Sequence, residues 1–167
     1  HYYAVIDVNW NKSGSKVVTA SWDHTAIIWN AETGEKQFLL SGQTLPVFDV
    51  RWSADGSRIV SAGQSETAIV WDAKNGNKLH TLVHDDFVMT TSWSPDGSKV
   101  VTGCYNGKVR IWDAKTGKII HQLNGHYASA NEVSWSPDGK YIATASFDKS
   151  AVIWNAETGE FLYRLSG

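Results

Sequence analysis

The chain has 167 residues, of which 42% are hydrophobic and 19% are charged, a balance typical of a globular protein. Its 15 Lys and Arg against 17 Asp and Glu leave no positive field, which argues against nucleic acid or an anionic membrane as a partner. No apolar run approaches the roughly 18 residues needed to cross a bilayer. The single cysteine, Cys104, excludes an intramolecular disulfide and favours a reducing compartment such as the cytoplasm.

Two tryptophans and two glycines recur along the chain at steps of 42, 41 and 42 residues. The landmarks are Trp10, Trp52, Trp93 and Trp135; Trp29, Trp71, Trp112 and Trp154; Gly14, Gly56, Gly97 and Gly139; and Gly34, Gly76, Gly117 and Gly159. Self-similarity at one period indicates a repeat architecture. We therefore expect four units, 1–42, 43–83, 84–125 and 126–167.

The last unit shows the local structure most clearly. It predicts four strands, at 130–136, 140–146, 150–155 and 160–165. Turn residues separate them, and Gly139 supplies the positive φ of the first turn. Helical periodicity is not sustained in any segment, so the sequence predicts an all-β fold.

These repeats resemble the WD-repeat (WD40) family across essentially the whole chain. The resemblance rests on TrpAsp at 71–72 and 112–113, SerProAspGly at 94–97 and 136–139, and GlyHis at 125–126. Repeats 1 and 4 depart from it with TrpAsn at 29–30 and 154–155. The resemblance implies four blades of a β-propeller, each a four-stranded antiparallel sheet.

The resemblance also implies a buried hydrogen-bond chain in each blade, from Trp through a hydroxyl and His to Asp. The matching residues are His1, Thr19, Asp23 and Trp29, then His84, Thr102 and Trp112 with Asn106 in place of Asp, and His126, Thr144, Asp148 and Trp154. Repeat 2 has Gln43, Ser61, Ser65 and Trp71, so the two middle blades should be less tightly tied. A catalytic triad would not recur once per blade, which favours a structural role.

Aromatic residues gather where this family usually binds partners, next to the tight turn of each blade and near its first strand. They are Trp22, Tyr105 and Phe147 before the turn, and Tyr2, Tyr3, Phe48, Phe87, Met89 and Tyr127 near the first strand. Such side chains dominate binding hot spots, although packing between blades is an equal alternative. We expect a partner-binding face here, with Trp22 as its main residue.

One position of the innermost strand reads Asp7, Asp49, Thr90 and Glu132 in the four repeats. These carboxylates could face a central channel. Hard cations need converging oxygens at about 2.0 to 2.6 Å, whereas channel walls lie further apart. We expect no metal site and no cofactor.

An open row of four blades leaves the outer faces of its first and last blades uncovered. A ring of four would need steps of about 90°, whereas WD-type blades suit rings of about seven or eight. Gly167 and His1 stand in the register of Gly125 and His126, so two chains could continue each other's repeats. We expect a two-fold homodimer that completes an eight-bladed ring. A four-bladed monomer, a piece of a longer propeller and an engineered assembly are the alternatives.

The leading hypothesis for function is a non-catalytic scaffold that associates with itself and binds an unidentified protein or peptide. A second is an engineered or evolutionary model of propeller assembly whose only partner is itself. A third is a small-ligand or enzymatic site in the central channel. The third would need convergent, non-repeating polar residues, so it ranks last.

Overall fold

The computed structural model describes residues 1–166, and its regular elements are sixteen β-strands in four sheets. Blade 1 contains β1 (Val5–Trp10), β2 (Lys16–Ser21), β3 (Thr25–Asn30) and β4 (Lys36–Ser41). Blade 2 contains β5 (Val47–Trp52), β6 (Arg58–Gly63), β7 (Thr67–Asp72) and β8 (Lys78–Val83). Blade 3 contains β9 (Val88–Trp93), β10 (Lys99–Cys104), β11 (Val109–Asp113) and β12 (Ile119–Leu123). Blade 4 contains β13 (Ala130–Trp135), β14 (Tyr141–Ser146), β15 (Ser150–Asn155) and β16 (Phe161–Ser166).

Each blade is an antiparallel meander in which sequence neighbours are hydrogen-bonded neighbours, as expected for propeller blades. The strands of blade 4 lie within one residue of the bounds that the sequence predicts. Gly139 has a φ of 73°, which confirms the left-handed turn after β13. Gly167, the end of the expected fourth unit, lies outside the described residues. No helix within residues 1–166 has the length and apolar character to cross a membrane.

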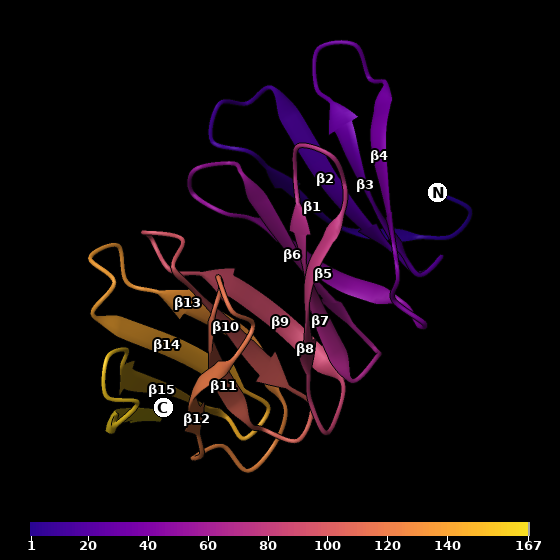
Figure 1. The fold of residues 1–167 in the computed structure, drawn as a ribbon. Coiled ribbons are helices and arrows are strands. Elements are labelled where there is room, and N and C mark those ends of the chain that lie inside the picture. The colour runs from indigo at the N-terminus through magenta and orange to yellow at the C-terminus, as the bar shows by residue number, and fades with distance from the viewer. Residues whose placement is uncertain (167) are drawn as a thin grey trace.

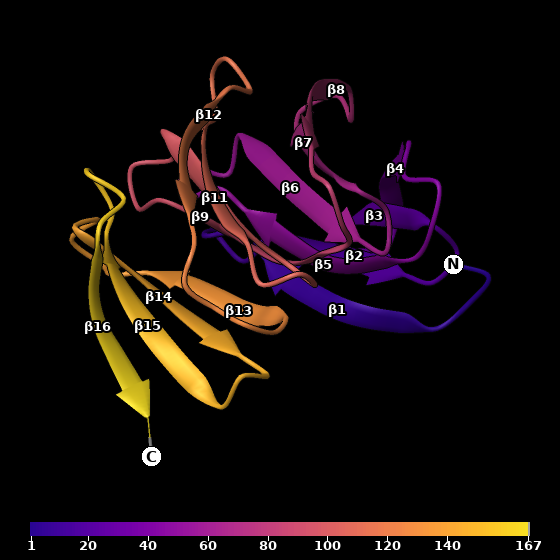
Figure 2. The same cartoon turned by 90° about the horizontal axis from the view of Figure 1, so that it is seen from below.

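The blades follow one another in chain order, from the indigo blade 1 to the yellow blade 4 (Figure 1). Their first strands are innermost, and β1 contacts β5, β5 contacts β9, and β9 contacts β13. The N-terminal and C-terminal blades lie apart in both views (Figures 1 and 2). The four blades therefore form an open arc.

The hydrophobic core lies between successive blades rather than within one sheet. We call the side of a blade that faces the preceding blade its leading face, and the opposite side its trailing face. At the first joint, residues of the trailing face of blade 1 and the leading face of blade 2 form one buried cluster, which includes Val18, Ile28, Leu40, Val47, Val50 and Trp52. Two similar clusters fill the joints between blades 2 and 3 and between blades 3 and 4. Each blade is therefore stabilised mainly by its neighbours.

The two end faces of the arc expose apolar side chains that the internal joints bury. Trp10 on the leading face of blade 1 is 59% exposed, whereas its counterparts Trp52, Trp93 and Trp135 are 7 to 9% exposed. Leu165 on the trailing face of blade 4 is 55% exposed, whereas its counterparts Leu40, Leu82 and Leu123 are each 1% exposed. Both end faces thus have the composition of a joint without the partner.

Candidate functional site

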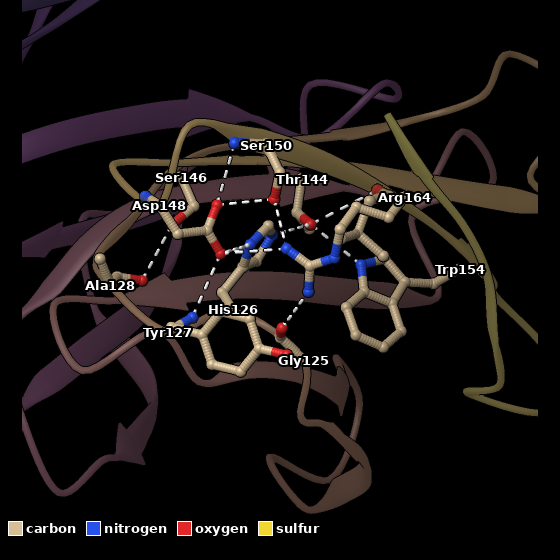
Figure 3. A network of polar contacts seen from close by, with 11 residues as sticks. Gly125, His126, Tyr127, Ala128, Thr144, Ser146, Asp148, Ser150, Trp154 and Arg164 are labelled. Carbon is tan, nitrogen blue, oxygen red and sulfur yellow. Dashed lines mark hydrogen bonds and ion pairs between the residues drawn. The ribbon is translucent and has the colours of Figure 1, made fainter. Parts of the chain in front are cut away.

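The polar chain of blade 4 links four of its elements (Figure 3). Trp154 on β15 donates its indole N–H to Thr144 Oγ1 on β14 at 2.9 Å. The same hydroxyl lies 2.7 Å from His126 Nε2, and His126 Nδ1 lies 2.8 Å from Asp148 Oδ2 in the turn after β14. The indole, hydroxyl, imidazole and carboxylate thereby satisfy one another in a buried setting.

Asp148 is held in its ionised form by this arrangement. Burial opposes ionisation, but hydrogen bonds from Ser150, His126 and the backbone N–H of Tyr127 hold the pKa of Asp148 well below its usual range. The carboxylate therefore fixes the imidazole and the start of β15 together.

Arg164 on β16 adds a cap to this chain that sequence reasoning missed. Its guanidinium donates to Ser150 Oγ at 2.6 Å, to Asp148 Oδ2 at 3.3 Å and to the carbonyl oxygen of Gly125. The guanidinium carbon also lies 5.1 Å from the ring centroid of Tyr127. Figure 3 shows the Arg164 side chain extending from the outermost strand across the polar hydrogen-bond chain of blade 4. The equivalent positions hold Leu39, Thr81 and Gln122, so no repeat pattern signalled this role.

Blade 1 forms the same chain as blade 4. His1 Nε2 lies 2.8 Å from Thr19 Oγ1, and His1 Nδ1 lies 2.8 Å from Asp23 Oδ2. Trp29 donates its indole N–H to the Thr19 hydroxyl at 2.8 Å. The structure thus brings together all four residues predicted for this blade.

The middle blades keep the tryptophan and hydroxyl but change the rest. In blade 3, Trp112 donates to Thr102 Oγ1 at 2.9 Å, and His84 Nε2 lies 2.8 Å from that hydroxyl. His84 Nδ1 pairs with the carbonyl oxygen of Leu82 at 2.9 Å in place of a carboxylate. Burial is the main cause that lowers the pKa of His84 to about 4, so its imidazole is neutral at pH 7.

In blade 2 the side-chain amide of Gln43 takes the place of the imidazole in the polar chain. Gln43 Nε2 donates to Ser61 Oγ at 3.2 Å, and Gln43 Oε1 accepts a hydrogen bond from Ser65. Trp71 donates its indole N–H to Ser61 Oγ at 2.8 Å. Blade 2 therefore keeps a continuous chain with uncharged groups only.

These hydroxyls are not placed for nucleophilic chemistry. Thr144 and Thr102 are buried, and the two tryptophans occupy them as hydrogen-bond donors. A nucleophile must reach its substrate and lie next to an oxyanion site. The arrangement instead fastens strands of one blade to each other. Burial likewise raises the pKa of the Cys104 thiol to about 12, as expected for an inert cysteine.

Two of the carboxylates that were expected to face a central channel, Asp7 and Asp49, instead join neighbouring blades. Asp7 Oδ2 accepts the backbone N–H of Val50 at 2.9 Å and pairs with Arg51 at 2.5 Å. Asp49 Oδ2 accepts the backbone N–H of Thr91 at 2.9 Å, and Asp49 Oδ1 pairs with Arg51 at 2.7 Å. The innermost strands of blades 1 and 2 are thereby each hydrogen-bonded to the next blade through a carboxylate.

A β-bulge explains why this role was not foreseen. In all four blades the register between the first two strands shifts just before this position, for example between Val47 and Asp49. The shift turns the carboxylate sideways, toward the next blade. Burial raises the pKa of Asp49 to about 7, while Arg51 and Thr91 oppose that rise.

The predicted partner-binding aromatics separate into two groups. Six are exposed, and we call them the aromatic rim: Tyr2, Tyr3, Trp22, Tyr105, Tyr127 and Phe147. Three are half-buried, namely Phe48, Phe87 and Met89, and the Phe87 ring packs against Tyr105 with centroids 6.2 Å apart. The expected aromatic residues therefore divide into an exposed set that is available to a partner and a half-buried set that packs within the protein.

Backbone hydrogen bonds place the rim at one end of the sheets. The N–H groups of Trp22, Tyr105 and Phe147 each donate, at 2.9 to 3.0 Å, to a carbonyl just before the innermost strand of the same blade. Because the blades repeat the same geometry, these turns lie at the same end of the arc. Within the described residues, no group of three or more His, Cys, Asp and Glu side chains is arranged to hold a metal ion.

Four four-stranded blades, each with a tryptophan and a hydroxyl in a buried polar chain, define a WD-repeat protein of the β-propeller class. Residues 1–30 match the family model described as WD domain, G-beta repeat. Residues 28–165 match the family model described as eukaryotic translation initiation factor eIF2A, and the chain belongs to that family. A comparison with curated proteins found no match.

Proposed function

We propose that the protein is a non-catalytic interaction scaffold whose aromatic rim binds a protein or peptide. The observation that carries this proposal is the exposure of six large aromatic side chains in loops of blades 1, 3 and 4, three of them at the equivalent position before the tight turn. Aromatic residues bury a large area at little conformational cost, which makes them the usual centres of binding energy. WD-repeat proteins generally act as such scaffolds, which supports the same assignment.

The scaffold also associates with a second copy of itself, which covers its two end faces. The exposed apolar residues of these faces, Trp10 and Leu165 among them, support this part of the proposal. Propellers bury both sides of each blade, and two arcs of four blades can do so in one closed ring. The functional object is then an eight-bladed ring that carries two copies of the rim.

A comparative capture experiment tests the rim. The wild-type chain and a Trp22→Ala/Tyr105→Ala variant are immobilised, and bound proteins are quantified by mass spectrometry. Proteins of the translation initiation machinery are the first candidate partners to look for among the captured proteins, because the matching family model carries the name of a translation initiation factor. The amount of a specifically captured protein should fall at least about tenfold for the variant, because hot-spot contacts are removed.

The matched control is Ile119→Ala. Ile119 is exposed on the outermost strand of blade 3, away from the rim, and its counterparts in blades 1 and 2 are Lys36 and Lys78. Capture by this variant should equal that of the wild type. Equal capture of every partner by the rim variant would instead exclude the rim as the binding surface.

A further inference from the structure

We infer that the leading face of blade 1 docks on the trailing face of blade 4 of a second copy, in the same residue register as the three internal joints. This inference rests on the proposed self-association and specifies which residues of the two copies contact each other. It commits to one occupant for both end faces, another molecule of this chain. The internal joints supply the template, because every position of such a joint has a counterpart on one of the two end faces.

The apolar positions of the template are filled on both end faces. Val8 is 58% exposed, whereas its counterparts Val50, Thr91 and Val133 are at most 2% exposed because the preceding blade covers them. On the other side, Leu165 has the place of the buried Leu40, Leu82 and Leu123. Joining the two faces would bury Val8, Trp10 and Leu165 together, as the internal joints bury their counterparts.

A ring-on-glycine contact recurs at each internal joint and has one unfilled place. A side-chain carbon added to Gly76 would lie 3.2 Å from Phe38 Cβ, and one added to Gly159 would lie 3.1 Å from His121 Cβ. Gly117 meets His80 in the same way. Gly34 has the same conformation, with a φ of 72°, but a carbon added there would meet nothing within 4 Å.

The side chain that fits this place is Tyr163 of the second copy. Tyr163 is the counterpart of Phe38, His80 and His121, and it is exposed on β16. At the last internal joint, His121 Nε2 lies 2.7 Å from the carbonyl oxygen of Glu157. The corresponding pair across the two copies is the Tyr163 hydroxyl, as donor, and the carbonyl oxygen of Glu32.

Polar positions complete the match. Glu132 has the place of Asp7 and Asp49, whose carboxylates accept the backbone N–H groups of Val50 and Thr91. Glu132 is exposed, and its carboxylate is placed to accept a hydrogen bond from the backbone N–H of Val8 in the second copy.

A planar group that stacks on an indole forms a further pair. At the joint between blades 2 and 3, the Arg58 guanidinium lies 4.9 Å from the ring centroid of Trp93. Tyr141 in blade 4 and Trp10 in blade 1 are their counterparts, and both are exposed. Contact between two aromatic rings is attractive, so this pair favours the same register.

Symmetry then closes the assembly. Each chain carries one face of each kind, so a two-fold pair forms two identical joints and leaves neither face uncovered.

An engineered disulfide tests the register. In the internal joints, the Cβ separation at the ring-on-glycine contact is 3.1 to 3.2 Å, close to the roughly 3.5 to 4.5 Å of a disulfide. A Tyr163→Cys/Gly34→Cys chain should therefore form, on mild oxidation, a covalent species of two chains as its main product. The matched control, Tyr163→Cys/Ile119→Cys, should give no such species. The native Cys104 is buried and does not compete.

Solution mass by sedimentation provides the second measurement, since Gly34→Cys places a side chain at a positive φ. Wild type should have the mass of two chains. Val8→Glu and Leu165→Glu should each reduce it to one chain, while the exposed-strand control Ile119→Glu should keep two.

The outcomes separate the inference from the proposed self-association. A wild-type mass of one chain overturns both. A two-chain wild type whose mass survives Val8→Glu and Leu165→Glu, or whose two cysteine variants cross-link equally, overturns the register alone. A covalent ladder of more than two chains overturns the closed ring. Capture through the rim is measured separately, so its failure leaves the joint unaffected.

Discussion

The Asp49 carboxylate accepts two hydrogen bonds from Thr91, from its backbone N–H at 2.9 Å and from its hydroxyl at 2.5 Å. The two residues are 42 positions apart and lie on the innermost strands of successive blades. One side chain thus fixes how blade 3 sits against blade 2. The same residue also holds Arg51, which in turn pairs with Asp7, so three carboxylate and guanidinium groups hold the first two blades in place.

Asp49→Ala should therefore destabilise the arc strongly. The change leaves the Thr91 N–H and hydroxyl buried without an acceptor, at a cost of about 2 to 4 kcal/mol in the free energy of unfolding. Asp49→Asn retains one acceptor oxygen and should recover part of the loss. Urea unfolding followed by tryptophan fluorescence measures both. The control is Glu157→Gln at an exposed turn, which should change stability by less than about 0.5 kcal/mol. A loss for Asp49→Ala no larger than this control would contradict the proposed role.

The hydroxyl in the polar chain of blade 4 can be tested without changing its size. Thr144→Val removes the acceptor for the Trp154 N–H and the partner of His126 while keeping the shape of the side chain. We expect a loss of about 2 to 3 kcal/mol, because two buried donors or acceptors lose their partner. Thr144→Ser keeps the oxygen and should retain most of the stability. Thr158→Val, in an exposed turn, is the matched control, and thermal unfolding is the measurement.

His84 should make stability fall as the pH is lowered from neutral. Its pKa is about 4 in the folded chain and about 6.5 when unfolded, so the unfolded state binds the proton more readily. The contribution of His84 is fully present above pH 6.5 and is lost as the pH falls from 6.5 to 4. This loss amounts to about 2 kcal/mol between pH 7.5 and pH 5.

The comparison with His84→Gln isolates this effect. Gln43 has the same place in blade 2 and pairs with Ser61 there, so glutamine suits the site. Unfolding free energies of both chains are measured by urea denaturation across this pH range. Other titrating groups, including Asp49, cancel in the difference. A difference that does not vary with pH would show that burial of the imidazole has no such consequence.

The sequence predicts the blades well because each of their determinants is local and repeated. The turn at Gly139 and the tryptophan at 154 depend on residues within one unit, and four copies of the unit reinforce each signal. The polar chains of blades 1 and 4 could be predicted for the same reason. The direction in which Asp49 points could not be predicted, because it depends on a β-bulge and on the neighbouring blade. Arg164 has no counterpart in the other repeats, so periodicity carried no information about it.

Arg164→Ala should cost about 1 to 2 kcal/mol, because the guanidinium binds Ser150, Asp148 and the carbonyl oxygen of Gly125 while half-buried. Arg164→Lys keeps the charge but not the planar fork of donors, so it should recover only part of this loss. A double-mutant cycle with Tyr127→Ala measures the stacking contribution, which we expect at about 0.5 to 1 kcal/mol. Lys140→Ala provides the control for removing an exposed cation. If Arg164→Lys matched the wild type, charge alone would account for the cap, and the fork geometry seen around Asp148 would have no energetic consequence.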